Sequence, residues 1–121
     1  MKIVPFFKVR DIQEAIDFYT KILDFEIKYP DFTFDDWGVD LINGEAELQL
    51  SVWEGVSGLD INVLVDDVDI LFEKYTQRGL NQSHRIESPV HLRPIDQTWG
   101  RREFYVTDPS GNTLRFTAPI N

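Results

Sequence analysis

Residues 99–116 read WGRREFYVTDPSGNTLRF, and this stretch decides the fold. The run from Arg102 to Thr107 is strand-like, and a second strand-like run follows from Thr113 to Thr117. Between them, Pro109 pre-sets the backbone for a turn, and Gly111-Asn112 tolerate a positive φ. The stretch therefore predicts a β-hairpin.

The chain repeats itself at an offset of 56 residues. Val9-Arg-Asp-Ile12 aligns with Val65-Asp-Asp-Val68, and Tyr19-Thr20 aligns with Tyr75-Thr76. In each copy a short strand leads into a helix that carries one apolar stripe. The first helix is expected over 12–23, with Asp11 as its N-terminal cap. The second is expected over 68–78, with Asp67 as its N-terminal cap and Gly79 at its C-terminal end. The stripes are Ile12, Ala15, Ile16, Tyr19, Ile22 and Leu23 in the first copy, and Val68, Leu71, Phe72 and Tyr75 in the second.

Strands account for most of the remaining sequence. One strand precedes each helix, over 3–9 and 59–65, and three follow it. Asn43-Gly44 marks a hairpin turn within the first set. The expected strands after the helices cover 25–29, 37–42 and 47–52, then 81–88, 102–107 and 113–117, with a loop over 89–98. This order of helices and strands predicts an α+β fold of two tandem βαβββ modules, about 1–54 and 59–118, in a single domain. Because one helix covers only one face of a four-stranded sheet, we expect the two modules to pair.

Composition excludes several classes of function. The 121 residues contain no cysteine, so disulfides and thiolate metal sites are absent. No apolar run reaches the roughly 18 residues that span a membrane, and the first residues do not resemble a signal peptide. Residues 1–60 hold 13 acidic and five basic side chains, against eight and seven in residues 61–121. The net charge of −9 disfavours nucleic acid and anionic lipid as partners and favours cationic ligands, or serves solubility alone. We expect a cytoplasmic protein.

The hairpin motif resembles the glyoxalase/bleomycin-resistance family, which is also called the vicinal-oxygen-chelate fold. Trp99-Gly100, Arg102-Glu103-Phe104 and the turn Asp108–Asn112 carry the resemblance, and it is closer to the bleomycin-binding branch. The Arg102-Glu103 pair itself is expected to be structural, as an ion pair or as strand-surface residues. The resemblance implies that the two sheets curve into an open cleft, often across a homodimer. Most enzymes of the family need a metal ion, whereas the drug-binding members do not.

The metal-ligand positions implied by the family can be tested on this sequence. Anchored on the repeat, they fall on Val4, Gln49, Asp60 and Arg115. Valine and arginine cannot ligate a metal, and two remaining oxygen ligands do not hold a catalytic ion. His84 and His91 are expected at the surface, and no other cofactor motif occurs. We therefore expect no metal, no cofactor and no enzyme, although a lone general base such as Glu47 or Glu103 stays open.

An acidic and aromatic segment lies between residues 29 and 40. It holds four aromatic side chains (Tyr29, Phe32, Phe34, Trp37) and four aspartates (Asp31, Asp35, Asp36, Asp40). Aromatic faces stack on planar ligands and carboxylates attract cations. The alternative is that the aromatic residues belong to the core and the aspartates are merely solvated.

The resemblance also implies which residues line the drug cleft. The cleft would hold Asp31, Phe32, Asp36, Trp37, Gln49, Ser51, Asn62 and Trp99, with Trp37 of one protomer and Trp99 of the other enclosing the ligand's rings. Asn62 stands where a relative would offer an aromatic side chain. Pro5 would mark a strand exchange between protomers.

The function expected from the sequence is capture of a bleomycin-type antibiotic without chemistry. Two alternatives remain: a metal-dependent enzyme of the glyoxalase or dioxygenase kind, and a binder of another planar or cationic small molecule.

Overall fold

Each half of the chain forms a four-stranded sheet that mixes parallel and antiparallel pairs. The structure, a computed structural model, describes residues 1–31, 37–80 and 87–120. Its contacts divide between two units. The first unit comprises Met1–Leu59 with Asp108–Asn112, and the second comprises Asp60–Thr107 with Thr113–Asn121.

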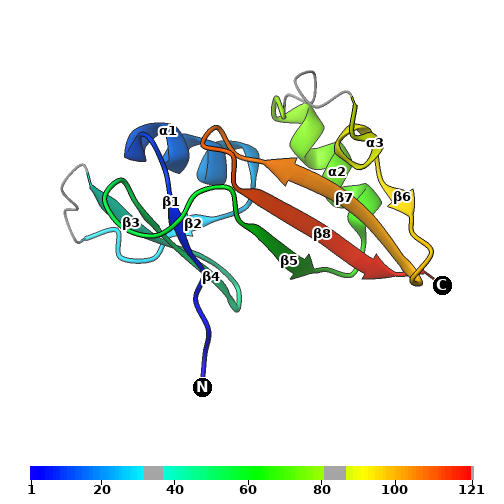
Figure 1. Ribbon diagram of the computed structural model, residues 1–121, viewed down its shortest axis with the longest axis horizontal. Coiled ribbons are helices and arrows are strands. Elements are labelled where there is room, and N and C mark those ends of the chain that lie inside the picture. Colours follow the sequence, from blue (N-terminus) through cyan, green and yellow to red (C-terminus); the bar gives the residue numbers. More distant parts are fainter. Residues whose placement is uncertain (32–36, 81–86, 121) are drawn as a thin grey trace. The chain divides into compact units, whose positions relative to one another are not determined.

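The first unit has the order β-α-β-β-β. Its sheet runs β1-β4-β3-β2, with β1 parallel to β4 and the other pairs antiparallel (Figure 1). A π-helical segment, η1, continues the helix α1. The bounds are β1 (Phe6–Lys8), α1 (Ile12–Asp17), η1 (Phe18–Ile22), β2 (Glu26–Ile27), β3 (Gly38–Asn43) and β4 (Ala46–Ser51).

The helix of the first unit begins as the sequence predicts and ends differently. The Asp11 side chain accepts a hydrogen bond from the Glu14 amide at 2.8 Å, which confirms the cap. The second half is not regular α-helix, because the Leu23 amide donates to the Phe18 carbonyl five residues earlier. Phe18, which the predicted stripe omits, is 9% exposed and packs edge-on against Tyr19.

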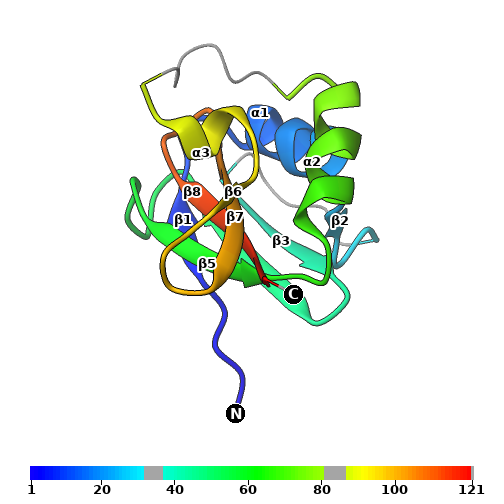
Figure 2. The same cartoon turned by 90° about the vertical axis from the view of Figure 1, so that its right-hand side faces the viewer.

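The second unit repeats this order with one addition, the short helix α3. Its sheet runs β5-β8-β7-β6, and α2 packs against one face of it (Figure 2). The core beneath α2 contains the stacked rings of Phe104 and Phe116, whose centroids are 4.9 Å apart, with Phe72 edge-on to Phe104. The bounds are β5 (Asp60–Leu64), α2 (Val68–Gln77), α3 (Pro89–Leu92), β6 (Ile95–Asp96), β7 (Arg101–Thr107) and β8 (Thr113–Pro119).

The strand expected over 81–88 is corrected in part by the structure. Residues 81–86 lie outside the described residues, and residues 87 and 88 are not in a strand. The segment expected as a loop, 89–98, instead holds α3 and β6. Pro89 suits the first turn of a helix, because its missing N–H has no helical partner there. A two-residue strand such as β6 is too short to show alternation in the sequence.

The turn between β7 and β8 is fixed by the side chain of its first residue. Asp108 Oδ1 accepts hydrogen bonds from the amides of Ser110 and Asn112, each at 2.9 Å. Gly111 has φ +94°, so the predicted positive φ occurs there and not at Asn112. The predicted hairpin is confirmed, since β7 and β8 pair from Thr107–Thr113 outward.

The α+β fold of two βαβββ modules is therefore confirmed. The Asn43-Gly44 turn is confirmed as well, because Asn43 pairs with Ala46 and Gly44 has φ +60°. Within the described part of the chain, no helix is long and apolar enough to cross a membrane.

Candidate functional site

The sheet of the first unit has an apolar face and a polar face. Along β4, Leu48 and Leu50 are each 2% exposed and belong to the core. Because side chains alternate along a strand, Glu47 and Gln49 point to the opposite face. Gln49, which we expected in the ligand cleft, lies opposite Phe6 of β1.

Glu47 is held by two lysines. Its carboxylate forms ion pairs with Lys2 and Lys28, and its side chain is 9% exposed. A carboxylate engaged in this way is a poor general base, so the structure does not favour Glu47 in that role. Asp31, another expected ligand residue, is exposed and lines a shallow pocket with Tyr29.

Two tryptophans form a stacked pair on the first unit. The rings of Trp37 and Trp53 are nearly parallel, at 4°, with their centroids 5.7 Å apart. Trp37 is 40% exposed and Trp53 is 72% exposed. An exposed pair of large aromatic side chains is a surface that can stack on a flat ligand.

Sequence reasoning included Trp37 in the site and missed Trp53. The hairpin register holds the signal that would have found it. Once Asn43 pairs with Ala46, antiparallel counting brings residue 37 to residue 52, and the Val52 amide donates to the Trp37 carbonyl at 2.9 Å. Trp53 is the next residue, so both indoles lie at the same end of the β3–β4 hairpin.

Ser51 is placed differently from what its expected role requires. It is 1% exposed, and its Oγ accepts hydrogen bonds from the amides of Trp53 and Glu54 at 3.0 and 3.1 Å. Its hydroxyl therefore supports the turn that carries Trp53. The other two expected ligand residues of this unit, Phe32 and Asp36, lie outside the described residues, as does His84.

The second unit carries a polar network on the face of its sheet opposite α2. Glu103 is 3% exposed. Its Oε1 accepts from the Tyr105 hydroxyl at 3.1 Å and its Oε2 accepts from Trp99 Nε1 at 3.3 Å. Arg115 Nη2 donates to the Tyr105 hydroxyl at 2.6 Å and lies 3.7 Å from Glu103 Oε1. Burial raises the pKa of Tyr105, and its contacts with Glu103 raise it further while Arg115 opposes the rise.

A pocket of about 290 Å³ opens beside this network. Its lining includes Asn62 and Trp99, both expected in the site, together with Arg101 and Arg115. Trp99 is 57% exposed. The period of two along Arg101, Glu103 and Tyr105 is the sequence signal that these side chains share one face.

His91 is not a surface residue, contrary to expectation. It is 2% exposed, and its ring nitrogens lie 2.9 Å from Ser88 Oγ and 2.9 Å from Thr107 Oγ1. Its ring also packs edge-on against Tyr105. The buried histidine therefore packs against Tyr105, one member of the polar network of the second unit.

The residues at the metal-ligand positions do not fit a metal ion. Val4 precedes β1, and the register places Phe6 opposite Gln49 and Asn62 opposite Arg115. Of the four positions named from the sequence, Val4 and Arg115 offer no metal-binding atom, and the two oxygen donors that remain, Gln49 and Asp60, do not make a ligand set for a catalytic divalent ion. Across the described residues, no group of three or more histidine, aspartate or glutamate side chains is arranged to hold a metal.

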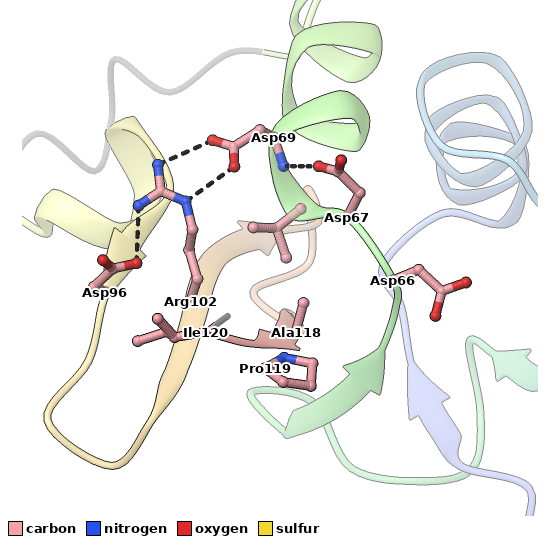
Figure 3. Close-up of a pocket in the computed structure, with 9 residues that line it drawn as sticks. Asp66, Asp67, Asp69, Asp96, Arg102, Ala118, Pro119 and Ile120 are labelled. Atoms are coloured by element: carbon pink, nitrogen blue, oxygen red, sulfur yellow. Dashed lines mark hydrogen bonds and ion pairs between the residues drawn. The ribbon is translucent and has the colours of Figure 1, made fainter.

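Arg102 and Glu103 point to opposite faces of β7, so they do not form an ion pair with each other. Arg102 instead donates to both carboxylate oxygens of Asp69 and to Asp96, each at 3.0 Å (Figure 3). The hydrogen bonds that Arg102 donates to Asp69 lower the pKa of that carboxyl group. The arginine thus ties β7 to the first turn of α2 and to β6, which is a structural role.

Comparisons with known proteins give the same fold. A bleomycin-binding protein in complex with bleomycin is 20% identical with a TM-score of 0.74 and 99% of each chain covered. A bleomycin resistance determinant encoded on the transposon Tn5 is 20% identical with a TM-score of 0.75, covering 100% of this chain and 99% of its own. Lactoylglutathione lyase from Agrobacterium tumefaciens is 16% identical with a TM-score of 0.73, covering 97% and 92%. No curated protein matches the sequence.

A bleomycin-binding protein and a lactoylglutathione lyase thus share the fold of two βαβββ units seen in this chain. The model of the glyoxalase/bleomycin resistance protein/dioxygenase superfamily matches residues 6–116. The chain therefore belongs to this superfamily.

Proposed function

We propose that this protein captures a small molecule of the bleomycin type, which carries a flat aromatic system and a positive charge, and leaves it chemically unchanged. The observation that carries the proposal is the stacked pair of Trp37 and Trp53, 40% and 72% exposed. Two large apolar rings held parallel at the surface are costly unless something covers them. A planar heteroaromatic ligand extends such a stack by one ring.

Charge supports the cationic part of the ligand. The net charge is −9, and residues 1–60 carry most of the excess of acidic side chains. Asp31 is exposed in the same unit as the tryptophan pair. A positively charged ligand would be drawn toward this unit and held by contacts with carboxylates and aromatic faces, where a cation–π contact adds about 0.5–2 kcal/mol.

The absence of a reaction is part of the proposal. The four positions implied by the resemblance hold Val4, Gln49, Asp60 and Arg115, of which only Gln49 and Asp60 offer an oxygen ligand. Resistance to a toxic compound would then come from stoichiometric binding, which needs affinity and no catalytic group.

A homodimer would complete the site. In the family arrangement, Trp37 of one protomer and Trp99 of the other enclose the ligand, and Pro5 marks the strand that is exchanged. In the single chain, β1 pairs with β4, and residues 1–3 before it are exposed, whereas the Pro5 carbonyl accepts a hydrogen bond of 2.9 Å from the Gln49 amide of β4 (Figure 1). Sedimentation equilibrium with and without ligand tests the dimer directly.

The experiment that tests the proposal is a titration of the purified protein with bleomycin, metal-free and copper-loaded, followed by tryptophan fluorescence. We expect saturable quenching at one or two drugs per dimer with submicromolar affinity. A linear response without saturation, or no response, contradicts the proposal. The variant Ile70→Ala, which removes an apolar side chain that is 63% exposed on α2 and outside the expected site, should bind bleomycin as the unmodified protein does.

A further inference from the structure

The pocket of the second unit presents two guanidinium groups whose donors are only partly used. Arg101 Nε donates to Thr117 Oγ1 at 2.9 Å, and its two terminal nitrogens have no partner among the described residues. Arg115 Nη2 donates to the Tyr105 hydroxyl, while its Nε is buried and, within the same described part, has no hydrogen-bond partner. Buried donors are almost always satisfied in proteins, so this one needs an explanation.

The neighbouring carboxylate does not neutralise these donors fully. The Glu103 side chain is 5% exposed. One of its oxygens accepts from Tyr105 and the other from Trp99, and the nearest Arg115 nitrogen is 3.7 Å away. Glu103 thus faces inward and is engaged. The pocket lining holds two arginines and one glutamate, so it is locally positive in a chain of net charge −9.

An aromatic wall stands beside the two arginines. Trp99, a residue that is 57% exposed, lines the same pocket, and the hydrogen bond from its Nε1 to Glu103 Oε2 orients the ring. Asn62 lies next to Arg115 across the β5–β8 pair and adds an amide that can donate or accept. A positive charge next to an exposed ring suits a ligand that is itself flat and anionic.

We propose that this pocket binds a carboxylate attached to a planar aromatic ring. The carboxylate accepts charge-assisted hydrogen bonds from Arg101 and Arg115, and the ring stacks on Trp99. The inference rests on the proposed function in one respect, since it takes Trp99 as a ligand contact. It goes beyond the proposed function by adding a second ligand class, an aromatic carboxylate, to the cationic molecule proposed above.

Three probes with the same ring separate charge from stacking. Isothermal titration calorimetry of the full chain would compare 2-naphthoate, 2-naphthamide and 2-naphthylmethylammonium. We expect 2-naphthoate to bind about tenfold tighter than the amide, because it gains the charge-assisted hydrogen bonds, and the ammonium to bind more weakly than the amide. Equal affinity of the three probes, or tightest binding of the ammonium, overturns the inference.

Variants locate the effect. Arg101→Gln and Arg115→Gln should each reduce the preference for 2-naphthoate over 2-naphthamide by about threefold or more, whereas Arg93→Gln, which removes the same charge at an exposed position, should leave it unchanged. Arg115 also packs over the Tyr105 ring, with its guanidinium 4.7 Å from the ring centroid. If Arg115→Gln does not fold, Arg101→Gln decides the matter. An unchanged preference in Arg101→Gln overturns the inference.

A parallel titration with bleomycin keeps the two proposals apart. Binding of 2-naphthoate with the expected preference, without binding of bleomycin, supports the carboxylate pocket and contradicts the proposed function. Binding of bleomycin without any preference for 2-naphthoate contradicts the carboxylate pocket alone.

Discussion

The hydroxyl of Tyr19 donates a hydrogen bond of 2.7 Å to Oδ2 of Asp108, a residue 89 positions further along the chain. Both side chains are buried, with Tyr19 at 0% and Asp108 at 3% exposure. Asp108 also organises the turn over Asp108–Asn112, and Asn112 Nδ2 donates to the Lys8 carbonyl at 3.1 Å. The turn motif that identifies the family is therefore part of the core of the first unit.

Tyr19→Phe should destabilise the protein at neutral pH. The substitution removes one buried hydrogen bond to a carboxylate, and such bonds contribute about 1.5–3 kcal/mol. Denaturant unfolding followed by circular dichroism would measure the loss. Tyr29→Phe is a suitable control, because Tyr29 is 47% exposed. A Tyr19→Phe variant as stable as the wild type would contradict the structural role of this contact.

The same pair predicts a loss of stability in alkali. Burial, followed by the neighbouring Asp108, raises the pKa of Tyr19 well above its usual value near 10. The folded state then holds this proton more tightly than the unfolded state, so the stabilisation is complete below about pH 10 and is lost as pH rises toward the folded pKa. The free energy of unfolding, measured at intervals from about pH 8 to about pH 11.5, should fall more steeply with pH in the wild type than in Tyr19→Phe. Parallel curves would refute this origin.

Gly55→Ala should be more destabilising than Gly58→Ala. Both glycines have a positive φ, +93° and +76°, so an alanine is strained at either position, at a cost of about 1–2 kcal/mol. Only at Gly55 would the added Cβ also meet a side chain, with Phe6 Cδ1 at 2.6 Å. The midpoint of thermal unfolding would be measured for both variants. Gly58→Ala reports the backbone strain alone, and Gly55→Ala reports the strain together with the clash. Equal losses would mean that the loop yields at Gly55 without disturbing Phe6.

The sequence predicted most of the fold because its local signals agree with the final structure. Asp11 and Asp67 cap helices, Gly79 ends one, and the Asp108–Asn112 turn joins two long strands. The failures occurred where local signals are weak or absent. A two-residue strand such as β6 has no alternation to detect, and π-helical geometry at the end of the first helix depends on packing.

The candidate site was only partly predictable. Trp37 and Trp99 entered the predicted site through the resemblance to the bleomycin-binding branch, and both are exposed in the structure. Trp53 was missed because its place depends on the hairpin register, and the engagement of Glu103 by Trp99 and Tyr105 depends on side-chain contacts. The resemblance also implied that Ser51 contacts the ligand. In the structure its hydroxyl oxygen instead accepts hydrogen bonds from the backbone amides of Trp53 and Glu54.

Alanine substitutions at the tryptophans should weaken binding of bleomycin. Trp37→Ala, Trp53→Ala and Trp99→Ala each remove an exposed ring, and we expect each to cost more than about 1 kcal/mol, or at least about fivefold in Kd. Calorimetry is the appropriate method, since each substitution also removes a fluorophore. Unchanged affinity in both Trp37→Ala and Trp99→Ala would rule out enclosure of the ligand between them.

Salt should slow the association of a cationic ligand without abolishing the complex. The net charge of −9 steers a cation toward the protein, and added salt screens this attraction. Stopped-flow association at about 50 and 500 mM salt should show a several-fold decrease in the association rate, with a smaller change in the dissociation rate. An association rate independent of salt would show that charge does not steer the ligand.

The most direct test of capture without chemistry combines binding with recovery of the ligand. The protein would be saturated with metal-free bleomycin in a calorimeter, and the drug would then be released by denaturation and analysed by mass spectrometry. Our account predicts one or two drugs bound per dimer, submicromolar affinity and recovery of the drug with its mass unchanged. Absence of binding, or a drug altered in mass, would contradict it.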